Sequence, residues 1–429
     1  MKNEEYQKYK RVKNQISYRY KNHYPVEKIL GIDLGILIFA KKKKFTVKSY
    51  LSYIIKHTLP VFFKTLNLSY LKVNEPSKTL FSMGTFKRKD YYEIREDVKS
   101  RIKKTASFDF STQNHKYKLS FKNIYLAWIV INRTKELGLL SRFRLASKMT
   151  FYLNVIDDLE KINPVFGKYC AFSSVHDFET LLTSYFQKKK IKTYSLQHGI
   201  YSVLHDNITL DMILYENFIS DFHLCWGQYT KDEFTKYGID KDALIVAGYP
   251  RKVSRPSIPS GLNRHECLLL LTSYMYHESN VKLLQIIKEL ISVHEPNLKV
   301  NVKIHPNSVR EKYEEIVAEE ENWSIVPQEQ TLTELFKSSK FGWAAAINSA
   351  AYYEAYIYNI PCFRLTDPAF EDSVDINDDK FSNLNELKER LNAVPFEDSE
   401  KLMTYFDEIN ERLNYAIGIN RDEYQVLEV

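Results

Sequence analysis

Short apolar runs alternate with amphipathic segments of helical period along the chain from about residue 122 onward. The runs that resemble buried strands are 169–172, 191–196, 223–226 and 243–247, and each is followed at once by Ser, Gln or Gly. The segments with helical period are 142–160, 177–188 and 231–237. Buried strands that alternate with helices predict parallel βαβ units.

A stretch rich in Pro, Ser and Gly, residues 251–263, interrupts this alternation and is typical of an interdomain linker. A second α/β series follows it. Its predicted strands are 267–272, 298–304, 341–347 and 360–365, and its predicted helices are 281–293, 332–337 and 351–358. We therefore expect an α/β fold of two Rossmann-like, doubly wound parallel-sheet domains that face a central cleft. The expected units are a first domain at 1–250, a second domain at 264–395, and a C-terminal helix within 396–429 that packs back on the first domain.

The N-terminal part is harder to assign. Residues 1–27 are polar and basic and are either an arm or the first helix, whereas 45–71 carries a helical pattern. Residues 73–120 are basic with few apolar positions, which suggests an irregular, flexible region. We expect residues 1–120 to form a basic, partly helical extension close to a membrane or an acceptor.

Composition excludes several classes of protein. The chain has 429 residues, of which 44% are apolar and 27% charged, so it is globular rather than disordered. Its four cysteines, which are Cys170, Cys225, Cys267 and Cys362, lie far apart without a CxxC pair. No metal or redox site is therefore expected, and a reducing compartment is. The first residues lack the apolar core of a secretory signal.

Charge is distributed unevenly. Residues 1–150 hold 33 Lys and Arg against 11 Asp and Glu, whereas residues 251–429 hold 19 against 30. The run Lys41–Lys44 follows the apolar segment 29–40, which contains Asp33 and is too short to span a bilayer. This pattern suggests peripheral attachment to an anionic membrane surface, and an ordinary core helix with a solvated end is the alternative.

Polar residues that could carry chemistry stand where predicted strands end. They are Gln197, His198, Gly199 and Tyr201 after the strand 191–196; Tyr249 and Arg251 after 243–247; Ser273 after 267–272; His305 and Pro306, preceded by Lys303, at the end of 298–304; and Asn348 and Ser349, with Glu354 a turn later, after 341–347. Ligands of open α/β sheets bind beyond the carboxyl ends of the strands. Because these groups come from both sides of the linker, one ligand between two domains accounts for all of them.

The residue types indicate transfer of a group from a phosphate to a hydroxyl. A neutral His198 can remove the acceptor proton, and His305 can donate to a phosphate oxygen. Ser349 begins a helix, where an anion is favoured, and Glu354 can accept from a ribose diol. Structural alternatives remain open: His198 as a loop cap, His305 as a strand end, Ser349 as an N-cap and Glu354 as a solvated helix residue.

The order of these segments resembles the bacterial GT-B glycosyltransferases of surface polysaccharide assembly, over roughly residues 150–370. The nearest resemblance is to the capsule Kdo and sialyl-type transferases and to the CDP-glycerol glycerophosphotransferase-like polymerases. Their His-Gly or acid-Gly loop is matched by His198 and Gly199, their Gly-x-Pro-Arg segment by 248–251, and their Lys/Arg-x-His-Pro segment by 303–306. Their nucleotide-binding Ser turn with a following Glu-Ala and Pro is matched by Ser349, 354–355 and Pro361.

The resemblance implies an inverting, metal-independent enzyme without a cofactor. It would move a sugar from a nucleotide-activated donor, with a CMP-sugar favoured, to a polysaccharide or lipid-linked acceptor at the inner face of the cytoplasmic membrane. Gln197 stands where the polymerases usually have tryptophan, and Lys252 and Val253 follow where an Asp is often found, so the donor stays open. A CDP-alditol phosphotransferase of teichoic-acid type and a non-catalytic partner subunit remain alternatives.

Two other classes of protein fit less well. A metal-dependent GT-A enzyme would need an Asp-x-Asp at a strand end, but Asp157 and Asp158 lie in a predicted helix. Nucleic-acid binding would use the basic N-terminal third, but it explains neither the histidines at strand ends nor the acidic C-terminal third. The sequence does not determine the oligomeric state.

Overall fold

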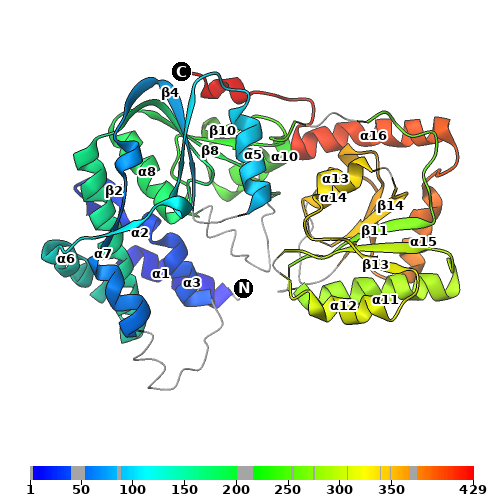
Figure 1. The fold of residues 1–429 in the computed structure, drawn as a ribbon, viewed down its shortest axis with the longest axis horizontal. Coiled ribbons are helices and arrows are strands. Elements are labelled where there is room, and N and C mark those ends of the chain that lie inside the picture. The colour runs from blue at the N-terminus through cyan, green and yellow to red at the C-terminus, as the bar shows by residue number, and fades with distance from the viewer. Residues whose placement is uncertain are drawn as a thin grey trace.

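The computed structural model describes most of the chain. The described residues are 3–39, 54–84, 88–200, 216–252, 256–273, 276–306, 308–338, 340–347, 349–366 and 374–429. They form two lobes, each built around its own six-stranded sheet (Figure 1). Tyr201, Asn348 and Lys41–Lys44 were singled out from the sequence and lie outside the described residues.

The N-terminal sheet is parallel throughout, in the order β10-β9-β8-β7-β4-β5. Its strands are β4 (Asn74–Met83), β5 (Thr105–Asp109), β7 (Val165–Ala171), β8 (Lys192–Leu196), β9 (Phe222–Cys225) and β10 (Leu244–Val246). Chain order reverses between β4 and β7, so the topological switch point, where ligands bind in open α/β sheets, lies between these two strands.

Helices surround this sheet. They are α1 (Asn3–Gln15), α2 (Val26–Ile29), α3 (Gly31–Phe39), α5 (Lys89–Lys99), α6 (Phe121–Asn132), α7 (Leu139–Ile162), α8 (Asp177–Lys188) and α10 (Gln228–Tyr237). Two small antiparallel pairs accompany them, β1 (Arg19–Tyr20) with β2 (Tyr24–Pro25) and β3 (Lys64–Leu66) with β6 (His115–Tyr117). In Figure 1, α6 and α7 lie at the edge of this lobe, on the side away from the C-terminal domain.

The C-terminal sheet is also parallel, in the order β13-β12-β11-β14-β15-β16. Its strands are β11 (Glu266–Leu270), β12 (Lys299–Lys303), β13 (Trp323–Ile325), β14 (Trp343–Ala346), β15 (Cys362–Leu365) and β16 (Lys380–Phe381). Its helices are α11 (His277–Val293), α12 (Glu311–Ala318), α13 (Leu332–Lys337), α14 (Ala351–Ile357) and α15 (Leu384–Ala393). Numbered along the chain, the strand order is 3-2-1-4-5-6, the Rossmann order, with its switch point between β11 and β14.

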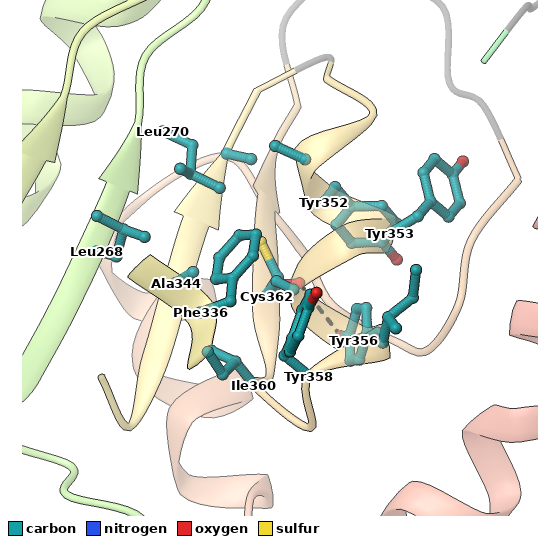
Figure 2. Packing of buried hydrophobic residues seen from close by; sticks show 14 of the residues in the cluster. Leu268, Leu270, Phe336, Ala344, Tyr352, Tyr353, Tyr356, Tyr358, Ile360 and Cys362 are labelled. Atoms are coloured by element: carbon teal, nitrogen blue, oxygen red, sulfur yellow. Dashed lines mark hydrogen bonds between the residues drawn. The ribbon is translucent and has the colours of Figure 1, made fainter. Parts of the chain in front are cut away.

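Continuous apolar strands explain why helices cover this second sheet. Leu268, Leu270 and Ala344 are buried, and Figure 2 shows them packed with the aromatic side chains of α13 and α14. Strands that are buried on both faces need such uninterrupted apolar runs. The two Rossmann-like domains confirm the predicted α/β fold class.

The largest error of the sequence prediction concerns residues 73–120. They are not irregular but supply β4, β5 and α5, and β4 is a central strand at the switch point. The first half of β4 is polar, and its register against β7 shifts between Glu75 and Thr79, so only Thr79–Met83 carries a buried pattern. The described part of the predicted helix 45–71 is also different, because short π and 3₁₀ turns over 54–63 lead into β3.

The C-terminal helix α16 (Ser399–Ile417) joins the two domains, because it packs against α14 on one side and α10 on the other. Asp398 caps its start, and Gly418 ends it in the left-handed conformation, with φ of 64°. The following residues lie on the first domain, where the Tyr424 hydroxyl donates to the Gly248 carbonyl at 2.8 Å. Gly248 has φ of 101°, and an added Cβ would lie 2.1 Å from the Arg421 carbonyl oxygen, so this close crossing requires glycine.

Candidate functional site

The loop after β8 is held by Gln197, whose side chain is only 1% exposed. Its Oε1 accepts from the Trp226 backbone N–H at 2.6 Å, and its Nε2 donates to the Gly199 carbonyl and to the Thr230 hydroxyl. The amide that was expected to face the acceptor therefore points into the protein. In this structure Gln197 fixes the backbone that presents its neighbour, His198.

His198 lies among aromatic rings at the carboxyl edge of the first sheet. Its ring is 5.3 Å from that of Tyr91, 5.4 Å from that of Phe172 and 6.1 Å from that of His176. Burial, reinforced by His176, His223 and Arg88, lowers the pKa of His198 to about 3. The ring is therefore neutral across the physiological range and keeps a lone pair that can accept a proton.

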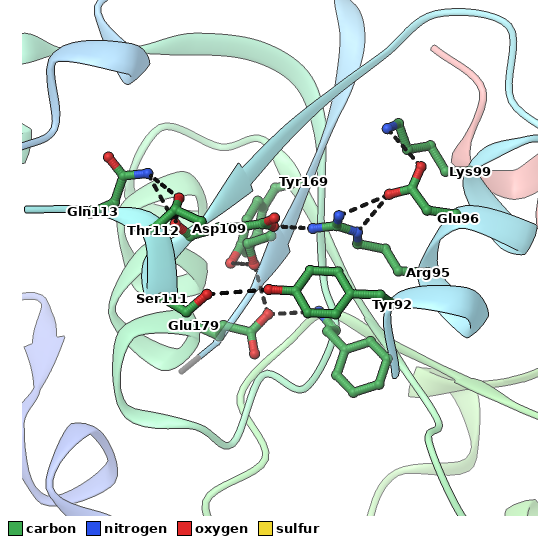
Figure 3. A network of polar contacts seen from close by, with 12 residues as sticks. Tyr92, Arg95, Glu96, Lys99, Asp109, Ser111, Thr112, Gln113, Tyr169 and Glu179 are labelled. Atoms are coloured by element: carbon green, nitrogen blue, oxygen red, sulfur yellow. Dashed lines mark hydrogen bonds and ion pairs between the residues drawn. The ribbon is translucent and has the colours of Figure 1, made fainter. Parts of the chain in front are cut away.

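Sequence reasoning missed the contribution of α5. This helix begins beside the loop and brings Arg88 and Tyr91 to it, with Arg88 in a bidentate ion pair with Asp90 and 4.2 Å from the Tyr91 ring centroid. The helix is held in place by Arg95, which pairs with Asp109, and by Tyr92, which hydrogen-bonds Ser111 (Figure 3). Ile94 and Val98, four residues apart and buried, were the periodic signal that could have revealed this helix.

A second feature that sequence reasoning missed is a buried carboxylate at the switch point between β4 and β7. Glu179 is fully buried and accepts hydrogen bonds from the Ser82 hydroxyl and from the backbone N–H groups of Phe172 and Ser173. The Nδ1 atom of His176 lies 4.0 Å from Glu179 Oε2, and burial lowers the pKa of this histidine to about 4. His176, beside this carboxylate, thus places a second neutral imidazole next to the ring of His198.

His305 lies at the carboxyl end of β12 in the other domain. Burial and the positive charge of Arg88 lower its pKa, whereas Asp90 raises it. Arg88 therefore acts electrostatically on both His198 and His305, one from each sheet.

Lys303 precedes His305 and braces a loop in this structure. Its ammonium group donates to the carbonyls of Pro327 at 2.8 Å and Gln330 at 2.7 Å, with a longer contact to Gln328. These contacts occupy the ammonium N–H groups of Lys303, which were expected to bind the phosphate of the nucleotide-sugar. Pro306 follows in a turn that the Ser308 N–H closes onto the His305 carbonyl at 2.9 Å.

The switch point of the second sheet carries Ser273 beyond β11 and Ser349 beyond β14. The end of β11 is tied down by Asn280, which hydrogen-bonds both the N–H and the carbonyl of Thr272 at 2.9 Å. Ser349 Oγ accepts from the Ala351 N–H at 3.2 Å, as a residue that begins a helix does. The predicted nucleotide-binding turn therefore stands at the edge where the Rossmann order places ligands.

Tyr249, Arg251 and Glu354 meet at the junction of the two domains. The Tyr249 hydroxyl donates to Glu354 Oε1 at 2.9 Å, and Arg251 lies 3.3 Å from the Thr333 hydroxyl and 3.8 Å from Glu93. Glu354 was expected to bind a ribose diol, and in this conformation it accepts from the other domain instead. Burial and the neighbouring carboxylate raise the pKa of Tyr249 well above its usual value.

No group of three or more His, Cys, Asp or Glu side chains placed to hold a metal ion occurs among the described residues. None of the helices in this part of the chain is both long enough and apolar enough to cross a membrane.

No family model and no curated protein matches the chain. Among solved structures, it is similar to UDP-GlcNAc 2-epimerase from Methanocaldococcus jannaschii, with a TM-score of 0.44, 13% identity, and coverage of 78% of this chain and 99% of that one. For the lipopolysaccharide outer core galactosyltransferase WaaB, the TM-score is 0.42 and the identity 12%, with coverage of 82% of this chain and 93% of that one. For Anabaena Alr3699/HepE in complex with UDP-glucose, the TM-score is 0.48 and the identity 8%, with coverage of 80% of this chain and 96% of that one. These similarities assign no activity to the chain.

Proposed function

We propose that the chain is an inverting, metal-independent glycosyltransferase that moves a sugar from a nucleotide-activated donor, with CMP favoured as the nucleotide, to a surface-polysaccharide or lipid-linked acceptor. The observation that carries the proposal is the position of His198 just after β8 and of His305 just after β12, one in each domain, with the charge of Arg88 acting on the pKa of both. One group able to take a proton and one able to donate to a phosphate then come from opposite domains. This is the arrangement that in-line transfer to a hydroxyl needs.

In the proposed mechanism, neutral His198 removes the proton of the acceptor hydroxyl as the oxygen attacks the sugar carbon. The bond from that carbon to the donor phosphate oxygen breaks, and the nucleotide leaves with the electron pair. His305 and the turn at Ser349 stabilise the leaving phosphate, and Arg88 adds a positive charge nearby. The anionic donor also raises the low pKa of His198 when it binds, which makes the ring a stronger base in the complex.

The experiment measures turnover of CMP-, CDP- and UDP-activated donors by the native chain, with and without EDTA. Replacement of His198 by Phe keeps a ring against Tyr91 and Phe172 but removes the basic nitrogen. Loss of a general base should lower kcat by roughly 10²–10⁴-fold while the nucleotide Kd stays unchanged. The exposed His294 provides the control variant, His294→Phe, which should keep native turnover.

His305→Ala should instead raise the nucleotide Kd by roughly tenfold or more, because a hydrogen bond to a charged group contributes about 1.5–3 kcal/mol. Native turnover in His198→Phe, or an unchanged Kd in His305→Ala, would contradict the assigned roles. Transfer of an alditol phosphate from a CDP donor would replace the glycosyl reaction by phosphotransfer. No turnover with any donor, together with tight binding to another transferase, would indicate a partner subunit.

The acceptor half of the proposal places the chain at the anionic inner face of the cytoplasmic membrane, held there by its basic N-terminal region. Residues 1–150 carry 33 basic against 11 acidic residues. Such an excess attracts anionic lipid and anionic polysaccharide. The charge supports the location without identifying the surface that makes the contact.

A further inference from the structure

The outward face of α6 carries an uncovered apolar stripe. Phe121, Tyr125 and Ile129 follow one another at intervals of four residues, and their exposed fractions are 75%, 69% and 39%. Tyr117 and Leu119, just before the helix, are exposed by 76% and 43%. Single exposed apolar residues are ordinary, but a contiguous row of them marks an interaction surface.

Packing of the opposite face prevents this stripe from turning inward. Asn123 is fully buried, and its Nδ2 donates to Asn154 Oδ1 and to Asp157 Oδ2, both at 2.9 Å. The Tyr20 hydroxyl donates to Asn123 Oδ1 at 3.1 Å. Because these bonds fix the rotation of α6 about its axis, its aromatic face points away from the core.

The residues around the stripe are mainly basic, which favours an anionic partner. Residues 115–148 contain eight Lys and Arg and a single acidic residue, Glu136, which is paired with Arg11. Two of the eight, Lys118 and Lys148, are themselves paired, with Asp158 and Asp33. Lys122 on α6 and Arg133, which caps its C-terminal end, are exposed, and neither forms an ion pair within the part of the chain that the structure describes. Aromatic side chains flanked by cations match the boundary of an anionic lipid bilayer. In a dimer formed through this face, the positive surface of one copy would meet the positive surface of the other, and the two would repel each other.

The apolar segment 29–40, for which the sequence left a membrane contact and a core helix open, contributes its first half to the N-terminal core. Ile29, Leu30 and Leu34 are buried in the N-terminal core, and Asp33 accepts a hydrogen bond from Tyr152 at 2.7 Å. Up to Phe39, the last described residue before the lysine run, this segment is a helix with one face in the core, whereas Ile36 is 43% exposed.

We infer that the α6 face, defined as Tyr117, Phe121, Tyr125 and Ile129 with Lys122 and Arg133, docks the chain on an anionic membrane. The inference rests on the proposed function in so far as that function places the acceptor at the membrane. The stripe enters the headgroup region while the two cations contact lipid phosphates. In Figure 1 this helix lies at the outer edge of the N-terminal domain, so docking leaves the domain junction uncovered.

The test is co-sedimentation of the full chain with phosphatidylcholine vesicles that contain or lack phosphatidylglycerol. The native chain should bind the anionic vesicles, and added salt should weaken the binding. Phe121→Ser combined with Tyr125→Ser should lower the partition coefficient about tenfold or more. Lys122→Glu combined with Arg133→Glu should lower it roughly tenfold at low salt.

Matched controls come from exposed residues of the C-terminal half, Met403→Ser on α16 and Lys312→Glu on α12. They should bind as the native chain does, and every variant should keep the native thermal midpoint because the altered side chains are exposed. Native-like binding by both α6 variants, or equal binding to both kinds of vesicle, would overturn the inference. So would a concentration-dependent dimer that the α6 variants abolish, since the occupant would then be a second copy.

Vesicle binding and turnover are measured separately, so the two proposals fail separately. Donor turnover with a water-soluble acceptor should persist in the α6 variants, because the stripe lies outside the site. Loss of turnover in His198→Phe with intact vesicle binding leaves the docking surface standing. Vesicle binding by a chain that turns over no donor refutes the proposed function alone.

Discussion

Replacement of Gln197 by Leu should destabilise the first domain and loosen the loop that carries His198. The side chain is buried, and its amide makes three hydrogen bonds, with Trp226, Gly199 and Thr230. Leucine fills a similar volume but leaves the Trp226 N–H without an acceptor. An orphaned buried donor costs about 1–3 kcal/mol, and each of the two other lost bonds about 0.5–1.5 kcal/mol, so we expect about 2–6 kcal/mol in total.

Urea unfolding followed by tryptophan fluorescence measures this loss, and Trp226 is a local reporter because its indole N–H donates to the Gln197 carbonyl at 2.9 Å. The control is Gln285→Leu, an exposed position on α11 in the other domain. Turnover should fall together with stability in Gln197→Leu, since the backbone beside His198 loses its support. A native unfolding midpoint in this variant would refute the bracing role.

Gln197→Glu tests the same brace by titration. A carboxylate still accepts from Trp226 but sets a second oxygen against the Gly199 carbonyl, whereas the protonated acid can donate to it. Burial raises the pKa of such a carboxyl group in the folded state, so its folded form is favoured at low pH and penalised as pH rises. Relative to the native chain at the same pH, this variant should be less destabilised at low pH than at neutral pH.

Two further predictions concern the domain junction and acid stability. Tyr249→Phe and Glu354→Gln in a double-mutant cycle should show a coupling energy of about 1.5–3 kcal/mol, the range for a hydrogen bond to a charged group, and additive effects would contradict the contact. His223 is buried with neither ring nitrogen hydrogen-bonded within the described residues, and burial lowers its pKa from 6.5 to about 3. The unfolded chain takes up this proton first, so stability is lost as pH falls below about 6.5, by about 2 kcal/mol near pH 5. His223→Phe should remove that part of the acid dependence, His294→Gln should not, and equal pH profiles for the native and His223→Phe chains would count against the assignment.

Local patterns sufficed for much of the fold. From β7 onward, the predicted strands and helices correspond to observed ones, because each is a short apolar run or a helical face bounded by Gly, Ser or Pro. The helix 177–188 was predicted with the bounds that the structure gives. The helices α12 and α15 were not predicted. The strands β13 and β16 were also missed, because two or three residues carry too little pattern to distinguish from a loop.

Local sequence patterns predicted only part of the candidate site. Strand ends were visible, so His198, His305 and Ser349 could be named. The direction in which Gln197 and Lys303 point was not visible, because it depends on partners 29 and 24 residues away. Arg88 and Tyr91 were missed because their helix lies in a basic stretch without a strong apolar period.

The sequence by itself determined the α/β class and the positions where chemistry can stand, since burial of apolar runs and the breaks between them are local properties. Tertiary structure alone decided which of those positions meet. Strand order places β4 beside β7 and sets Glu179 at a switch point, and α5 brings Arg88 to histidines of two domains. These outcomes depend on the packing of segments far apart in the chain, and local periodicity carries no information about them.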